Sequence, residues 1–143
     1  MRVFLDTNVL VAAFATRGLC ADVLRLTLAA HEMIVSETVL KELERNLRDK
    51  IGLPERELRS VLSLVREQAR LAEEGKATVT VLDPSDRPIL AAALASGADV
   101  MVTGDRDRLE LVPKPLPIVS PRSFWELAKG SDKKSCDVRG EIE

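Results

Sequence analysis

The 143-residue sequence has few of the side chains that usually supply nucleophilic, thiol or stacking chemistry. Its one histidine, His31, has no catalytic partner by sequence and is interpreted as structural. The two cysteines, Cys20 and Cys136, are far apart and form no CxxC pair, so we expect neither a disulfide framework nor a thiolate metal site. Aromatic residues are 3% of the chain and tyrosine is absent, which makes base stacking a weak means of holding a single-stranded nucleic acid.

Long apolar runs and an excess of one charge are missing as well. No run approaches the roughly 20 apolar residues that a membrane-spanning helix needs, and a strand rather than a signal peptide is expected at the N-terminus. We therefore expect a cytoplasmic protein in a reducing compartment, without a membrane partner. The net charge is −2, so a nucleic-acid partner would have to bind a local basic surface.

Apolar segments typical of short buried strands alternate along the chain with segments of helical periodicity. Thr7 and Asn8 are expected to cap the first helix, and a long helix is expected to extend from Leu58 to Ala72. This alternation favours an α/β fold with a mostly parallel sheet, and right-handed crossovers would place helices on both of its faces. Strands are predicted over residues 3–5, 33–35, 78–82, 100–102 and 118–119.

The length of the chain suits one domain with a full hydrophobic core. We assign residues 1–128 to this domain. Residues 129–143 are polar and aperiodic, and they are predicted to form a flexible C-terminal tail.

Four acidic residues stand where the predicted strand–helix units turn over. Because the carboxyl ends of parallel strands line a crevice at one edge of the sheet, these side chains should converge there. Carboxylates that converge repel one another unless they share a cation, and oxygen-only ligands favour Mg²⁺ or Mn²⁺. The four residues are Asp6, Glu42, Asp86 and Asp105.

Each acid also has a structural explanation when it is considered alone. Asp86 could cap a helix and Asp6 could belong to a turn. Glu42 lies on a helix that Ser36 is expected to begin, at the border of its apolar face, where a solvated glutamate is equally compatible with the pattern. Their shared position at one sheet edge is what favours a joint role.

A magnesium site at this edge would suit phosphodiester hydrolysis. Mg²⁺ binds one or two protein carboxylates, keeps several waters, acidifies a bound water and clamps a phosphate oxygen, so no protein nucleophile is needed. Neighbouring small polar residues would hold metal-bound waters or the carboxylates, although Asp107 is also explained as a first-turn helix acid. These supporting residues are Thr7, Asn8, Thr103 and Asp107.

Over residues 1–128 the motifs resemble those of the PIN-domain family of metal-dependent ribonucleases. The resemblance lies in an apolar strand leading to Asp6-Thr7-Asn8, the helical Glu42, Asp86 followed by Ile89, Ala91 and Ala93, and Thr103-Gly104-Asp105-Arg106-Asp107. At the place where many members carry a phenylalanine, this chain has Arg108-Leu109, which should alter local packing more than metal binding.

The resemblance implies a three-layer α/β/α fold around a mostly parallel five-stranded sheet, and Mg²⁺- or Mn²⁺-dependent endoribonuclease activity. It implies that Asp6, Glu42, Asp86 and Asp105 are the catalytic, metal-binding acids. The short single-domain form looks like the toxins of VapC-type toxin–antitoxin pairs, which implies a homodimer and an antitoxin protein as partner.

An RNA substrate needs cationic contacts near a site that is itself acidic. Arg87, Arg106 and Arg108 lie close to the predicted acids in sequence and are candidates for phosphate contacts. Solvated surface arginines explain the same residues equally well.

Two other classes of protein show part of this pattern, the first an opening strand followed by aspartate and the second the fold class and an acidic pocket, but each requires a residue that is missing here. A phosphatase of the haloacid-dehalogenase type needs a second aspartate where Asn8 stands. A receiver-type phosphoacceptor needs a lysine at the end of the last strand, where Ile118-Val119-Ser120 has none. A PIN-fold binding module that acts through a protein or RNA partner without cleavage remains the alternative.

Overall fold

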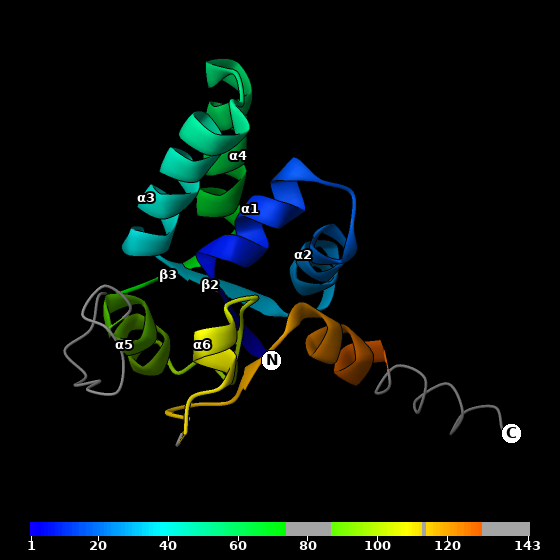
Figure 1. Cartoon of the computed structure of the whole chain (residues 1–143), viewed down its shortest axis with the longest axis vertical. Coiled ribbons are helices and arrows are strands. Elements are labelled where there is room, and N and C mark those ends of the chain that lie inside the picture. Colours follow the sequence, from blue (N-terminus) through cyan, green and yellow to red (C-terminus); the bar gives the residue numbers. More distant parts are fainter. Residues whose placement is uncertain (74–86, 113, 130–143) are drawn as a thin grey trace, which may run out of the picture.

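The structure, a computed structural model, describes residues 1–73, 87–112 and 114–129. Within these ranges one parallel sheet runs through the molecule (Figure 1). Its strand order is β3-β2-β1-β4-β5. The five-stranded parallel sheet predicted from sequence is therefore confirmed. Its strands are β1 (Arg2–Leu5), β2 (Glu32–Ser36), β3 (Arg70–Ala72), β4 (Val100–Val102) and β5 (Ile118–Val119).

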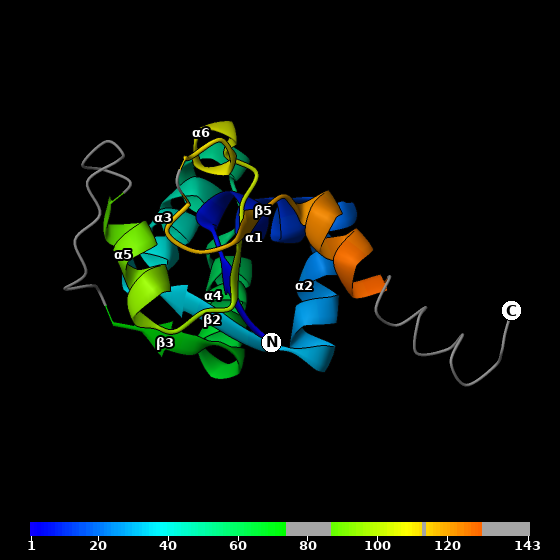
Figure 2. The same cartoon turned by 90° about the horizontal axis from the view of Figure 1, so that it is seen from below.

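Helices cover both faces of the sheet and produce three layers (Figure 1, Figure 2). The strand order steps outward from β1 to β2 and β3, and then returns to β4 and β5 on the other side. Because parallel crossovers are right-handed, reversing the direction moves the connecting helices to the opposite face. The helices are α1 (Thr7–Ala15), α2 (Leu19–Ala30), α3 (Glu37–Asn46), the π-helical turn η1 (Leu47–Ile51), α4 (Glu55–Gln68), α5 (Arg87–Ala95), α6 (Arg106–Leu109) and a last helix over 121–129. None of the helices in the described ranges has the length and apolarity to cross a membrane.

The central strands are buried on both faces. Val3, Phe4 and Leu5 of β1 and Met101 and Val102 of β4 are almost completely inaccessible to solvent. Such near-continuous apolar runs are typical of parallel strands that helices cover on each side. Each of these side chains contributes on the order of 1.5–3 kcal/mol through burial, so the two strands are held rigidly side by side.

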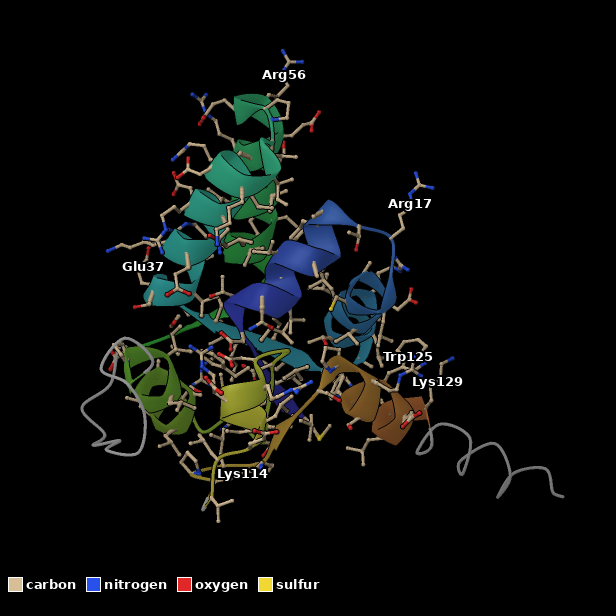
Figure 3. The ribbon with its side chains drawn as sticks, in the orientation of Figure 1. Arg17, Glu37, Arg56, Lys114, Trp125 and Lys129 are labelled. Atoms are coloured by element: carbon tan, nitrogen blue, oxygen red, sulfur yellow. The ribbon has the colours of Figure 1, made fainter. Side chains whose placement is uncertain are left out.

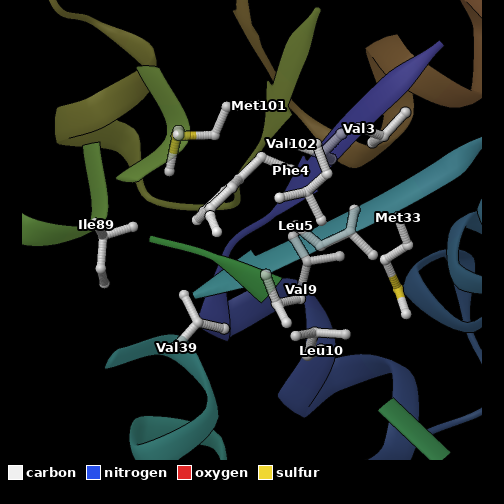
Figure 4. Close-up of a cluster of buried hydrophobic side chains, with 14 of the residues drawn as sticks. Val3, Phe4, Leu5, Val9, Leu10, Met33, Val39, Ile89, Met101 and Val102 are labelled. Carbon is white, nitrogen blue, oxygen red and sulfur yellow. The ribbon is translucent and has the colours of Figure 1, made fainter. Parts of the chain in front are cut away.

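The core continues from the strands into the surrounding helices (Figure 4). Val9 and Leu10 of α1 pack against the sheet, and so do Val39 of α3 and Ile89 of α5. All four side chains are at most 1% exposed. The strand ends that carry the candidate acids therefore sit on a packed support.

The third strand differs from the sequence prediction. The helical spacing of Ala69 and Ala72 predicted a helix through residue 72, but α4 ends at Gln68 and the backbone of Ala69 is extended, with φ −99° and ψ 148°. Residues 70–72 instead pair with Ile34, Val35 and Ser36 of β2. Pairing with the backbone groups at the edge of β2 outweighs a weak local helix preference. The strand predicted over residues 78–82 lies outside the described residues.

Helix α3 begins where the sequence predicted. The Ser36 hydroxyl accepts a hydrogen bond from the Val39 backbone N–H at 3.2 Å, which caps the helix. The apolar side chains Leu40 and Leu43 are buried against the core. Gly52, with φ 77°, ends the π-helical turn that follows in a left-handed conformation suited to glycine. The packing of this face fixes the direction in which Glu42, at its border, projects.

One ion pair joins α3 to α4 on the molecular surface. Glu37 projects from the first turn of α3 (Figure 3), and its Oε1 accepts a hydrogen bond from Arg66 Nη2 at 2.8 Å. A second contact of 3.5 Å links Arg66 Nη1 to Oε2. The Arg66 hydrogen bond lowers the pKa of Glu37 below its ordinary value of 4.5. The side chains are 34% and 53% exposed, so solvent weakens the pair.

We expect Glu37→Gln to reduce the free energy of unfolding by less than about 1 kcal/mol at neutral pH. A lowered carboxyl pKa contributes stability above the unfolded-state pKa, and this contribution is lost as the pH falls through the folded-state value. The difference between wild type and Glu37→Gln should therefore shrink below pH 4.5, as measured by urea unfolding across pH. Glu67→Gln on α4 is the control, because Glu67 forms no ion pair among the described residues. A difference that grows at low pH would contradict the expectation.

Candidate active site

The candidate site lies where the strand order reverses, between β1 and β4. Asp6 directly follows β1, and Thr103 directly follows β4. Leu5 is paired with Val102, and the Asp6 backbone N–H donates to the Val102 carbonyl at 3.0 Å, so the two strand ends are level. In open α/β sheets the carboxyl ends of strands at such a reversal form the usual ligand-binding crevice.

The carboxylate of Asp6 is fully buried and held from several directions. Its Oδ1 accepts from the Thr7 backbone N–H at 2.7 Å, and its Oδ2 accepts from Thr103 Oγ1 at 2.8 Å. Asp6 is thus the N-cap of α1, a role that was predicted for Thr7 and Asn8. The correction has a physical reason, since the extended backbone of Asp6 points its carboxylate at the first helical N–H and the helix N-terminus favours an anion.

Asn8 and Thr103 lock the loop after β4 onto the start of α1. Asn8 Nδ2 lies 3.2 Å from Thr103 Oγ1 and 3.4 Å from Asp6 Oδ2, and Asn8 Oδ1 accepts from the Gly104 N–H at 2.6 Å. A Cβ at position 104 would come within 3.2 Å of that same Asn8 oxygen, so glycine permits the close approach. The structure thereby places two residues predicted as supports in direct contact with Asp6.

Asp105 stands at the mouth of the same site. It caps α6, because its Oδ1 accepts from the Asp107 backbone N–H at 2.9 Å, and its own N–H donates to Thr103 Oγ1 at 3.0 Å. The Asp105 side chain is 34% exposed. Asp107 supports this arrangement through its backbone, while its side chain is exposed.

Glu42 approaches from α3. Thr7 Oγ1 donates to Glu42 Oε1 at 2.8 Å, and Thr7 adjoins Asp6 in the chain, so the helix-border position brings Glu42 to the edge of the site. The fourth predicted acid, Asp86, lies outside the described residues, as does the side chain of Arg87. The described part of the chain therefore brings together Asp6, Asp105 and, through Thr7, Glu42.

Arg108 is the residue whose position sequence reasoning missed. Its side chain is 8% exposed, and its Nη1 forms a short ion pair with Asp6 Oδ2. Its Nε lies 3.7 Å from Asp105 Oδ2. From the sequence, Arg108 is expected to contact RNA phosphates or to alter local packing. In the structure its guanidinium instead contacts Asp6 and Asp105. The available signal was its spacing, since Asp105 and Arg108 are three residues apart and share one face of α6.

The pair between Asp6 and Arg108 satisfies an electrostatic requirement. Taking a charge out of water costs several kcal/mol unless a partner compensates it. Asp6 is fully buried and Arg108 nearly so, so each supplies the counter-charge that the other needs. Removing one member of such a buried pair typically costs about 3–5 kcal/mol of stability.

The donor set fits a hydrated hard cation. Asp6 and Asp105 offer carboxylate oxygens, the ligand type that Mg²⁺ and Mn²⁺ prefer. Thr103 and Asn8 act instead as hydrogen-bond donors that hold the Asp6 carboxylate. In the described ranges no group of three or more histidine, cysteine, aspartate or glutamate side chains is close enough to hold a metal. Two carboxylates are nevertheless sufficient for Mg²⁺, which completes its shell with water.

The parallel sheet, with Asp6 and Asp105 where its strand order reverses, defines an α/β protein with a candidate metal site at the carboxyl ends of its strands. A family model described as PIN domain matches residues 2–107, and the chain belongs to the PIN-domain family. The fold is similar to a chain in the crystal structure of VapBC2 from Rickettsia felis bound to a DNA fragment from their promoter, with a TM-score of 0.61 and 18% sequence identity. The match covers 84% of this chain and 98% of that chain. No curated protein matches the sequence significantly. The predicted family and fold are confirmed.

We expect Thr103→Val to destabilise the protein by about 1–3 kcal/mol, because the buried Asp6 carboxylate loses a donor and the Asp105 N–H loses its acceptor. Thr27→Val is a matched control. Thr27 is equally buried, but its hydroxyl bonds to a helix carbonyl alone, Val23 O at 2.8 Å. Urea unfolding of both variants gives the comparison. An equal loss of unfolding free energy in the two variants would show that the Thr103 hydrogen bonds contribute no more than an ordinary buried hydroxyl.

Proposed function

We propose that the chain is a metal-dependent endoribonuclease in which Asp6, Glu42, Asp86 and Asp105 are the metal-binding and catalytic acids. The observation that carries the proposal is that Asp6 and Asp105 lie together where the strand order reverses, and that both face the guanidinium of Arg108. Membership of the PIN-domain family supports it, because PIN domains are generally nucleases that use divalent metals.

Some residues of the site would bind the metal, and others orient the carboxylates that bind it. Asp6 and Asp105 would hold the metal, and the hydroxyl of Thr103 and the amide of Asn8 keep the Asp6 carboxylate in one orientation. Glu42, whose carboxylate accepts a hydrogen bond from Thr7, would activate the attacking water together with Asp86. When bound, Mg²⁺ or Mn²⁺ supplies the acidification of water and the clamping of a phosphate oxygen.

The proposed substrate is RNA, held through its phosphates. Arg106 is exposed on α6, next to Asp105, and forms no ion pair within the described part of the chain. With Arg87 at the start of α5, it is the proposed phosphate contact. Arg108 points inward in this state of the site, which leaves the outer contacts to the other two.

We further propose that the protein is the toxin of a toxin–antitoxin pair, with a homodimeric form and an antitoxin protein as partners. The fold similarity to a chain of the VapBC2 structure supports this role. The alternative is a PIN-fold binding module that does not cleave, and it is disfavoured by the bonded network that keeps Asp6, Glu42 and Asp105 in place.

Asp105→Asn should reduce metal-dependent cleavage of a labelled single-stranded RNA by at least about 100-fold, since a charged metal ligand is lost. The fold should survive, because an asparagine oxygen can still accept the Asp107 N–H that caps α6. EDTA should abolish wild-type cleavage. Asp6 is a less suitable position, because Asp6→Asn deprives the buried Arg108 of its counter-charge.

Asp99→Asn is the matched control for this experiment. Asp99 precedes β4 at the opposite end of the strands, where its Oδ2 accepts from the Arg2 N–H at 2.8 Å. The Asp99→Asn variant should cleave the labelled RNA at the wild-type rate. Full activity in Asp105→Asn would refute the proposed site, and a folded wild-type protein that binds Mn²⁺ but cleaves no RNA would favour the binding module.

A further inference from the structure

We propose that Arg108 is a built-in counter-cation that occupies the metal position of the site and must leave when a divalent cation binds. The affinity for metal is then set by competition with the chain's own guanidinium. This inference rests on the proposed function, because it concerns the same pair of carboxylates.

The Oδ2 atom of the Asp6 carboxylate already accepts as many hydrogen bonds as it can hold. Its Oδ1 accepts from the Thr7 N–H, and its Oδ2 accepts from Thr103 Oγ1, Asn8 Nδ2 and Arg108 Nη1. Each carboxylate oxygen offers about two lone-pair positions, so a cation that binds Oδ2 must replace at least one of its three donors. The Thr7 donor belongs to the helix backbone, and the Thr103 and Asn8 donors are held by bonds to Asp105 and Gly104.

Charge singles out Arg108 among the four donors. A divalent cation beside Asp6 would compensate the buried carboxylate, so the guanidinium would no longer be needed there. Both cations together would repel strongly in a site of low dielectric constant. Arg108 also lies 3.7 Å from Asp105 Oδ2, so it faces both carboxylates that a metal would use.

The position of Arg108 in the fold allows it to leave. It belongs to α6, a four-residue helix at the outside of the sheet (Figure 1). Two other residues of this helix, Arg106 and Asp107, are exposed. Rotation of the long Arg108 side chain would bring the guanidinium to solvent while the buried strands β1 and β4 stay in place. The exchange thus requires a change of rotamer and no rearrangement of the core.

The test is the Mn²⁺ affinity of Arg108→Met, measured by isothermal titration calorimetry without RNA. Methionine keeps much of the length and apolar volume but removes the charge. We expect Mn²⁺ to bind at least tenfold more tightly than in wild type. We also expect the metal-free variant to melt at a lower temperature, with a larger rise in Tm on adding Mn²⁺.

Arg25→Met is the matched control. Arg25 pairs with Asp22 three residues earlier, the same spacing as Arg108 and Asp105, but on the exposed surface of α2. Its Mn²⁺ affinity should equal that of wild type. The double variant Asp105→Asn/Arg108→Met should lose the gain in affinity, which ties the gain to this site.

The outcomes separate this inference from the nuclease proposal. Equal or weaker Mn²⁺ binding in Arg108→Met would overturn the competition, while metal-dependent RNA cleavage by wild type would leave the nuclease standing. Failure of both proteins to bind Mn²⁺ would overturn both proposals.

A second measurement on the wild-type protein covers the case in which Arg108→Met does not fold. The Arg108 Nε–H signal in ¹⁵N NMR spectra, assigned with Arg108→Lys, should move to the position of solvated arginines at saturating Mg²⁺. An unmoved signal would overturn the inference.

Discussion

The buried carboxylate of Asp6 is the constraint on which the rest of the site depends. An anion in this position would be prohibitively unstable alone, and its neighbours follow from that fact: a helix N-terminus, a threonine hydroxyl, an asparagine amide and an arginine all turn toward it. The same requirement explains the loop geometry after β4, where glycine lets the backbone approach Asn8. The stability of the fold and the geometry of the site thus depend on the same group of contacts.

The family and fold followed from the sequence because their signals are local. Apolar runs such as Val3 to Leu5 indicate buried strands. An acid that directly follows such a run lies at the carboxyl edge of the sheet, because parallel strands end at the same edge. The position of Asp6 next to Thr103 and Asp105 is a consequence of strand pairing, which the alternation of elements largely determines.

Other features depended on contacts that no local pattern reveals. Residues 70–72 form a strand because an edge of β2 is there to receive them, and their own spacing is that of a helix. Arg108 could face water or the acids from the same helix, and the choice is made by the burial of Asp6. The hydrogen bond from Thr7 to Glu42 likewise needs α1 and α3 in their packed positions.

The two halves of the site come from opposite ends of the folded chain. Thr103 is 97 residues beyond Asp6, and Arg108 is 102 residues beyond it. Ribosomes deliver the N-terminal strand first, so a growing chain carries Asp6 long before β4 exists to complete the crevice. The acidic site can therefore form only late in synthesis, once β4 has paired with β1.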